Sequence, residues 1–269
     1  MNIREAIRNR RSIRTFDQTA LSPEDAQKIL KFAEMVENPY DIHISWYLLD
    51  GREKPLKAPV ISGAVTYIAG KMPRVAHAEE AFGYTFEKIV LYAETLGIGT
   101  TWIAGTMNRS VFEKAVSLQE GEVMPCVSPL GYPAKKMSLR ETLMRKGVKA
   151  DSRKPFEELF FDGSFHTPLS LESAGNLRDA LEAIRLAPSA VNKQPWRILC
   201  TQNAIHFFEI PSKGYSDSSG WDLQKIDMGI ALCHFSVVAA DCGIRHTFSV
   251  ERPEISIPDG MVYIASYRF

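Results

Sequence analysis

The apolar pattern of the first half of this chain recurs in the second half, and this repetition limits the folds that the chain can adopt. A helical apolar spacing, a tryptophan, a long apolar helix and a Gly-Ile pair occur twice in the same order, about 150 residues apart. The matching positions are Ala26, Ile29, Leu30 and Ala33 with Leu177, Ala180, Leu181 and Ile184; Trp46 with Trp196; Phe82, Phe86 and Ile89 with Met228, Leu232 and Phe235; and Leu96-Gly97-Ile98 with Cys242-Gly243-Ile244. Helical spacing alone could coincide by chance, but the ordered match of four different features indicates an internal duplication.

Length and composition leave room for one large core or two smaller ones. Of 269 residues, 45% are apolar and 24% are charged, which is ordinary for a globular chain. The 32 basic residues balance 32 acidic ones, so the sequence predicts neither a nucleic-acid nor a membrane partner. The longest apolar runs, 58–70 and 228–240, are too short and interrupted to span a bilayer, and the charged N-terminus is unlike a signal peptide. We therefore expect a cytoplasmic protein.

Cysteine and histidine spacing predicts no metal site. Cys126, Cys200, Cys233 and Cys242 form no Cys-x-x-Cys pair, and we expect reduced, mostly buried thiols. His234 lies on the inward side of an apolar helical stretch, where a hydrogen-bonded core histidine is a commoner outcome than a catalytic one. No Ser/His/Asp set or carboxylate pair stands out. We expect no catalytic side chain, so that any chemistry would belong to a cofactor.

Local signals predict an alternation of helices and strands in each half. Asn2 with Glu5 forms a capping box, and Ser22-Pro23 is a second strong helix start. In the first half, one helix is expected to begin at each of these two signals, and two further helices are expected over 79–96 and 109–115. The strands expected in this half cover 46–49, 60–69, 100–103 and 126–130. In the second half, helices are expected over 177–184 and 228–240, and strands over 197–200 and 261–267.

One polar loop, Ala187–Trp196, lies between a predicted helix and a predicted strand. Pro188 cannot continue the helix, and Pro195 favours an extended backbone before the strand. Between the prolines, the polar side chains of Ser189, Asn192 and Gln194 could hydrogen-bond the edge of a flat heterocycle. Because Pro, Ser and Asn are also common in ordinary loops, the residues alone leave both interpretations open.

A second candidate is the basic segment near the N-terminus. Arg10, Arg11 and Arg14, with the Ser12 hydroxyl, supply several donors within five residues, and planar guanidinium groups suit a phosphate. The alternative is a solvated basic helix end that interacts favourably with the helix dipole. The residues by themselves leave this choice open as well.

The third candidate is the segment Gly97–Gly105. Its Gly97-x-Gly99 is not a dinucleotide fingerprint, because Trp102 replaces the third glycine and the preceding segment is helical. The small residues of Ile103-Ala104-Gly105 would let a main-chain N–H approach a ring, whereas the Trp102 side chain is expected in the core.

These segments together resemble the nitroreductase family of FMN-binding proteins. The similar stretches are Ala187-Pro188-Ser189-Ala190-Val191-Asn192-Lys193-Gln194-Pro195-Trp196, Arg10–Phe16, Gly97–Gly105, and Gly131-Tyr132-Pro133 followed by Ser152-Arg153-Lys154-Pro155. The resemblance implies that Arg10, Arg11, Ser12, Arg14 and Arg153 bind the FMN phosphate; that Pro188, Ser189 and Asn192 contact the polar ring edge; and that a main-chain N–H of Ile103, Ala104 or Gly105 reaches flavin N5. A donor at N5 stabilises the reduced flavin.

The resemblance also implies an α+β fold of two pseudo-symmetric halves, each with a mainly antiparallel sheet flanked by helices. We expect a first half at 1–163, with the phosphate and N5 segments, and a truncated second half at 164–269, with the Pro-Ser-x-x-Asn loop. In family members that form homodimers, each flavin site combines these pieces from two subunits. One chain here has one complete set, which predicts a monomer that acts as a pseudo-dimer with a single FMN site between its halves.

The expected activity is that of an FMN-dependent oxidoreductase. NAD(P)H would be a transient reductant, and the acceptor would be a small molecule such as a nitroaromatic or a quinone. The alternative is a non-catalytic flavin-binding or redox-sensing protein with the same fold. The degenerate second set of motifs favours this alternative, and reduction of bound flavin by NAD(P)H distinguishes the two.

Overall fold

The computed structural model of the chain describes residues 1–52, 56, 58–215 and 221–269. These form two compact units, Met1–Ala150 and Asp151–Phe269. The division precedes the expected boundary at 163/164 because strand β6 (Phe160–Asp162) pairs in parallel with β7 (Trp196–Cys200) and so belongs to the sheet of the second unit. The expected assignment of the two halves to 1–163 and 164–269 stays a prediction.

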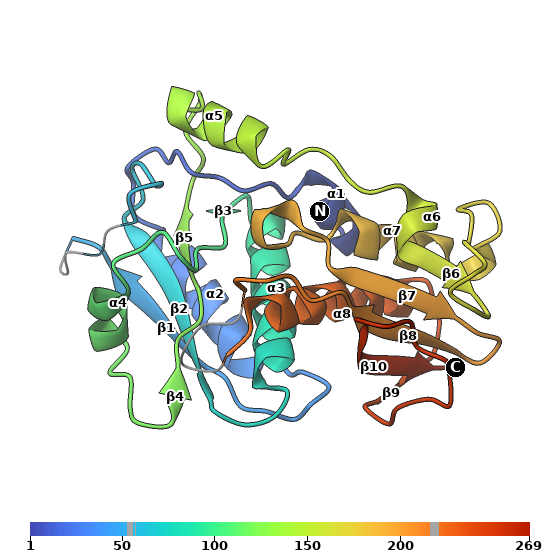
Figure 1. The fold of residues 1–269 in the computed structure, drawn as a ribbon. Coiled ribbons are helices and arrows are strands. Elements are labelled where there is room, and N and C mark those ends of the chain that lie inside the picture. Colours follow the sequence, from blue (N-terminus) through green and yellow to red (C-terminus); the bar gives the residue numbers. More distant parts are fainter. Residues whose placement is uncertain (53–55, 57, 216–220) are drawn as a thin grey trace. The chain divides into compact units, whose positions relative to one another are not determined.

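The first unit has an antiparallel sheet and five helices among its described residues (Figure 1). The strands run in the order β1-β2-β5-β3, and β4 pairs with β2. The elements are α1 (Ile3–Asn9), α2 (Pro23–Met35), β1 (Ser45–Asp50), β2 (Thr66–Pro73), α3 (Ala78–Thr95), β3 (Gly99–Thr100), α4 (Arg109–Ala115), β4 (Glu122–Val123), β5 (Val127–Gly131) and α5 (Leu139–Gly147).

The second unit has a sheet of order β6-β7-β8-β10-β9, in which only the β6–β7 pair is parallel. Besides β6 and β7, its elements are α6 (Phe156–Leu159), the 3-10 turns η1 (Gly175–Leu177) and η2 (Ala190–Asn192), α7 (Arg178–Leu186), β8 (Ala204–Glu209), α8 (Leu223–Asp241), β9 (Thr247–Ser249) and β10 (Val262–Arg268). The α+β prediction with mainly antiparallel sheets is confirmed.

The two units share one connectivity. Each runs helix, two strands, long helix, short strand and closing strand, and in each sheet the closing strand lies between the second strand and the short one. The long helices, α3 and α8, are buried on most of their surface. This shared order supports the internal duplication, which remains a prediction.

The capping signals in the sequence form as expected. Asn2 and Glu5 make the complete capping box of α1, and the Ser22 hydroxyl accepts a hydrogen bond from Asp25 N–H at the start of α2. Each such cap stabilises its helix by about 1 kcal/mol. The predicted helix at 109–115 agrees with α4, and the one at 79–96 is α3 shifted by one residue.

Two strand predictions were wrong in extent. The strand expected at 60–69 begins only at Thr66, because Ser62 instead pairs with Thr15 and Gly63 adopts a positive φ of 79°. A Cβ at Gly63 would lie 2.4 Å from the Phe16 carbonyl oxygen, so this turn requires glycine. The strand expected at 100–103 ends at Thr100, because Thr101 N–H donates to the Ser128 hydroxyl instead of a strand carbonyl.

Helix α8 is longer than the sequence suggested. Its 19 residues, with a mean hydropathy of 1.2, make it the one helix in the described parts of the chain that could cross a membrane by length and composition. Of that stretch, 72% is buried inside the protein. Such burial is typical of the core helix of a folded unit. The expectation that this apolar run is too short to span a bilayer was thus wrong on length.

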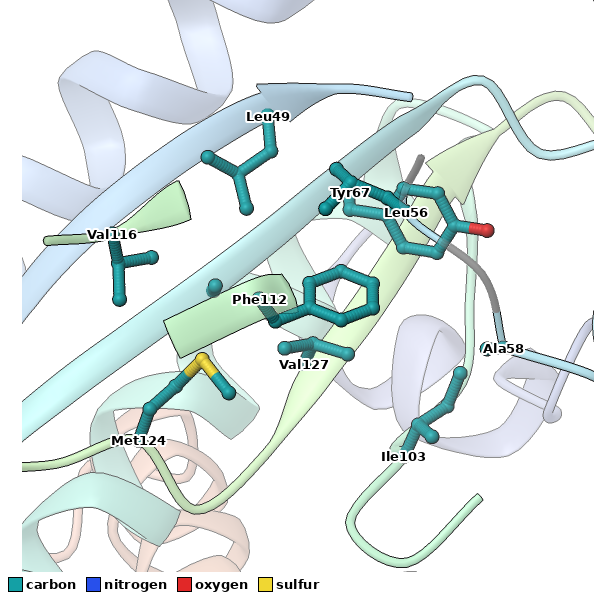
Figure 2. Close-up of a cluster of buried hydrophobic side chains, with 10 residues drawn as sticks. Leu49, Leu56, Ala58, Tyr67, Ile103, Phe112, Val116, Met124 and Val127 are labelled. Carbon is teal, nitrogen blue, oxygen red and sulfur yellow. The ribbon is translucent and has the colours of Figure 1, made fainter. Parts of the chain in front are cut away.

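A cluster of buried apolar side chains lies between α4 and the sheet of the first unit (Figure 2). Phe112 of α4 packs edge-on against Tyr67 of β2, with ring centroids 5.3 Å apart. Burying a phenylalanine of this kind contributes about 2–3 kcal/mol. Ile103 and Val127 belong to the same cluster, so the core fixes the position of the segment that starts at Ile103.

Candidate functional site

The basic segment of the first unit runs beside strand β3. Helix α1 ends at Asn9 with Arg10 as its C-cap, and beyond it Ile13 N–H donates to the Thr100 carbonyl at 2.8 Å. Gly99 makes this close approach possible, since a Cβ there would lie 3.0–3.1 Å from the Ile13 side chain. The extended backbone therefore directs alternate side chains, including Ser12 and Arg14, away from the buried Ile13.

Several buried guanidinium donors of this segment make no hydrogen bond to the described residues. The Nε and Nη1 atoms of Arg10 and the Nη1 atom of Arg14 make no hydrogen bond to any residue that the structure describes. Buried donors of this kind are costly unless they are satisfied, so they fit an anionic group such as a phosphate. Ser12 is half-buried nearby in the chain, whereas Arg11 is exposed.

Each buried arginine also has a carboxylate in its surroundings. Arg10 Nε lies 3.7 Å from Glu87 Oε1, with side chains that are 5% and 0% exposed. Burial lowers the pKa of Arg14, while the charge of Glu141 opposes this shift. Burial raises the pKa of Glu94, against the lowering effect of Arg10 and Arg11. The segment therefore combines fixed positive groups with partial charge compensation.

The N5 segment, Ile103-Ala104-Gly105, follows β3 and is held at Ile103 and Ala104. Ile103 exchanges two main-chain hydrogen bonds of 2.9 Å with Val127. The Ala104 carbonyl accepts a hydrogen bond of 2.9 Å from Arg109 Nη2. Gly105 is exposed, and a Cβ there would meet no atom within 4 Å. A flat ligand could therefore approach the main chain at Gly105.

The half-buried Trp102 packs its ring against buried side chains of α3, in line with the expected core position. Its ring centroid lies 4.5 Å from that of Phe86, and its indole Nε1 donates to Glu87 Oε2 at 3.0 Å. Glu87 was not singled out by sequence reasoning, because one acidic residue in an apolar helix carries no motif. Its place among Phe82, Phe86, Ile89 and Val90, at helical spacing, was the only available signal.

In the second unit, Pro188 ends α7 and the polar loop follows. The Ser189 hydroxyl accepts a hydrogen bond of 2.9 Å from Gln194 N–H. Val191, Asn192 and Gln194 all have a positive φ, between 51° and 57°. For a β-branched residue such as Val191 this conformation is strained, and local strain of 1–3 kcal/mol is a common feature of ligand-binding loops.

The loop is tied to the Ser152-Arg153-Lys154 segment of the same unit. Asn192 Nδ2 donates to the Ser152 carbonyl at 3.1 Å, and Gln194 Oε1 accepts from Lys154 N–H at 2.9 Å. Arg153 Nη2 donates to the Leu186 carbonyl at 3.1 Å. Gln194, which the sequence suggested could face a ligand, therefore uses its acceptor for the main chain.

A buried acid supports this loop from α8. Asp227 is 3% exposed, and its two carboxyl oxygens accept the Ala190 N–H at 3.0 and 3.1 Å. Burial raises the pKa of Asp227 well above its usual value. Sequence reasoning missed this residue too. His234, by contrast, is a hydrogen-bonded core histidine as predicted, with Nδ1 2.8 Å from the Ala183 carbonyl oxygen.

The predicted site residues thus form two groups, one in each unit. The first unit brings together the basic segment and the N5 segment, through the pairing of Ser12 with Thr100 on β3. The second unit brings together Arg153 and the polar loop. The predicted contacts of these residues with FMN stay predictions.

Comparison with protein families gives a match over most of the chain. A family model described as "Putative TM nitroreductase" matches residues 2–239. The chain belongs to this nitroreductase family. The match confirms the family resemblance seen in the sequence and places the chain among the oxidoreductases.

Solved structures of nitroreductases agree with this assignment. A protein described as a putative nitroreductase, from Thermotoga maritima, is 21% identical with a TM-score of 0.63, and the match covers 99% of this chain and 92% of that one. This likeness confirms the fold. Comparison with curated protein sequences gives no match.

Two further nitroreductase structures match about half of the chain. One, with bound FMN, is from Desulfitobacterium hafniense (19% identity, TM-score 0.43, 51% of this chain and 93% of that one). The other is described as FMN-dependent and is from Clostridium difficile (19% identity, TM-score 0.42, 52% and 94%). TM-scores this low support no conclusion about the present chain.

Proposed function

We propose that this nitroreductase-family chain is an FMN-dependent oxidoreductase. The observation that carries the proposal is the set of buried guanidinium donors of Arg10 and Arg14 that make no hydrogen bond to the described residues. A dianionic phosphate satisfies such donors with charge-assisted hydrogen bonds, which are about twice as strong as neutral ones.

In this proposal the chain's own residues bind and orient the cofactor. Arg10, Ser12 and Arg14, with further charge from Arg11 and Arg153, would hold the phosphate. Pro188, Ser189 and Asn192 would contact the polar ring edge, and the 103–105 main chain would donate to N5. When bound, FMN supplies the hydride-transfer chemistry. NAD(P)H is the proposed reductant, and a small nitroaromatic or quinone the proposed acceptor.

We further propose that the chain works as a cytoplasmic monomer with one FMN per chain. The basic segment occurs in the first unit. Near the position in the second unit where a duplicated basic segment would lie, the chain instead forms β6 and the turn after it. The four cysteines, Cys126, Cys200, Cys233 and Cys242, are thiols, which agrees with a reducing compartment.

The test is a visible absorption spectrum of the purified protein, with and without added FMN, combined with its mass in solution. Flavin bands at one equivalent per chain in a monomer support the proposal. Two equivalents per chain, or no binding at all, contradict it. NADH or NADPH is then added without oxygen. Rapid bleaching of the flavin supports an enzyme, and a stable oxidised flavin would support the alternative of a non-catalytic flavin-binding or redox-sensing protein.

A further inference from the structure

Arg109 makes three hydrogen bonds to main-chain carbonyls around the N5 segment. Its Nη2 donates to the carbonyl oxygens of Ala104 at 2.9 Å and Pro125 at 3.1 Å, and its Nη1 donates to the Met124 carbonyl. The Met124 and Pro125 carbonyls lie just before strand β5, in the core of the unit. The guanidinium therefore joins the exposed loop to a rigid part of the fold.

The hydrogen bond to Ala104 fixes the orientation of one peptide group. In a trans peptide the carbonyl of one residue and the N–H of the next point in opposite directions. Arg109 holds the Ala104 carbonyl, so it also sets the direction of the Gly105 N–H, which points away from the guanidinium. This N–H makes no hydrogen bond to any residue that the structure describes.

The side of Gly105 that a Cβ would occupy is open. Its φ is not in the left-handed region, and an added Cβ would contact nothing within 4 Å. Neither the backbone conformation nor packing inside this unit therefore requires glycine. Close approach by a ligand is a reason for a residue without a side chain at this position.

We propose that Arg109 is a positioning residue that orients and polarises the Ala104–Gly105 peptide toward the edge of the flavin ring. This inference rests on the proposed FMN binding. A cation on the carbonyl draws electron density from the peptide, which makes the Gly105 N–H a stronger donor. The reduced ring carries more negative charge at its edge than the oxidised ring, so a stronger donor favours the reduced form.

The position of Arg109 in the fold also allows a purely structural role. It is the first residue of α4, and its Nη1 lies 4.0 Å from Glu113 Oε1 on the same helix. A structural brace would affect the binding of oxidised and reduced FMN equally. A positioning residue affects them differently, and the midpoint potential of bound FMN measures this difference.

The experiment compares the wild-type protein with Arg109→Met and with Lys114→Met. Lys114 is an exposed cation on the same helix, so the second variant removes the same charge without touching the loop. We expect Arg109→Met to bind reduced FMN about tenfold more weakly relative to oxidised FMN. For a two-electron couple this lowers the midpoint potential by about 30 mV. Lys114→Met should leave the potential at the wild-type value.

A second measurement uses the protein without FMN. In a ¹⁵N-glycine NMR spectrum, the Gly105 amide signal, assigned with Gly105→Ala, should shift in Arg109→Met and stay in place in Lys114→Met. If Arg109→Met does not fold, Arg109→Lys replaces it in both measurements. Lysine keeps the charge but has one donor group, so we expect a smaller fall in potential in the same direction.

The outcomes separate this inference from the proposed function. Failure of the wild-type protein to bind FMN contradicts the proposed function. If the wild-type protein binds FMN and the arginine variant has the same potential, only the role of Arg109 is wrong. An equal fall in potential in Arg109→Met and Lys114→Met would also overturn it, because the effect would then come from charge alone.

Discussion

Glu87, which is fully buried in the first unit, accepts a hydrogen bond of 3.0 Å from the indole of the half-buried Trp102. The other carboxylate oxygen of Glu87 lies 3.7 Å from Arg10 Nε. One side chain on α3 therefore connects the two segments of this unit that the sequence assigns to FMN. Trp102 immediately precedes the N5 segment, and Arg10 begins the basic segment.

We expect Glu87→Gln to lower the free energy of unfolding by about 3 kcal/mol, because removing one partner of a buried ion pair leaves the other charge uncompensated. Urea unfolding at pH 7 measures this change. Inorganic phosphate should stabilise the variant more than the wild-type protein, since an anion can replace the missing charge beside Arg10.

The matched control for this prediction is Glu94→Gln on the same helix. Burial raises the pKa of Glu94, so the folded state disfavours its ionised form. Its amide variant should therefore be as stable as the wild-type protein at pH 7, or more stable. Equal losses in the two variants would show that Glu87 has no special role as the partner of Arg10.

We expect Arg14→Ala to weaken FMN binding by on the order of 2 kcal/mol, which is about a thirtyfold rise in Kd. The reason is the loss of a charge-assisted contact from a half-buried guanidinium. Fluorescence titration with FMN measures the affinity. Arg8→Ala, on the exposed face of α1, removes the same charge and should bind FMN normally. Unchanged affinity in Arg14→Ala would contradict the placement of the phosphate.

Local sequence signals predicted much of the fold. The Asn2–Glu5 box, Ser22-Pro23 and Pro188 act within a few residues of their own position, so their effect could be read directly. Strand β8 was not predicted, although it lies between β7 and β10 in the sheet. Its six residues are all buried, so they lack the alternation that marks a half-exposed strand.

The candidate site was predictable only in part, for a different reason. Arginine and loop motifs are contiguous in sequence, whereas their supports come from distant elements. Three residues on helices outside the motifs hydrogen-bond to the candidate segments or to a residue beside them: Glu87 on α3, Arg109 on α4 and Asp227 on α8. The left-handed conformation of Val191 could not be predicted from the sequence either, because valine is among the residues that adopt it least often.

We expect the four thiols to differ strongly in reactivity. Burial raises the pKa of Cys200 to about 12, so almost none of it is thiolate at pH 8. Cys242, at the end of α8, is half-exposed. Iodoacetamide at pH 8 followed by peptide mass spectrometry should show modification of Cys242 first, and of Cys200 only after urea unfolding. Early labelling of Cys200 in the folded protein would be inconsistent with this environment.

Asp227 should affect stability in opposite ways in two variants. Asp227→Asn keeps an acceptor for the Ala190 N–H and removes a buried charge, whereas Asp227→Ala leaves that N–H without a partner at a cost of about 1–3 kcal/mol. Urea unfolding should therefore find the asparagine variant at least as stable as the wild-type protein at pH 7, and the alanine variant less stable.

The pH dependence gives the sharper test of Asp227. The pKa of Asp227 in the folded protein is raised above its value of about 4 in the unfolded chain. At pH values between these two pKa values, the native protein therefore binds more protons than the unfolded chain. The contribution of this group to stability is thus present at low pH and is lost as the pH rises through this window. The stability advantage of Asp227→Asn should be greatest near pH 8 and shrink as the pH falls toward 5. A constant difference across this range would mean that Asp227 does not change its protonation on unfolding.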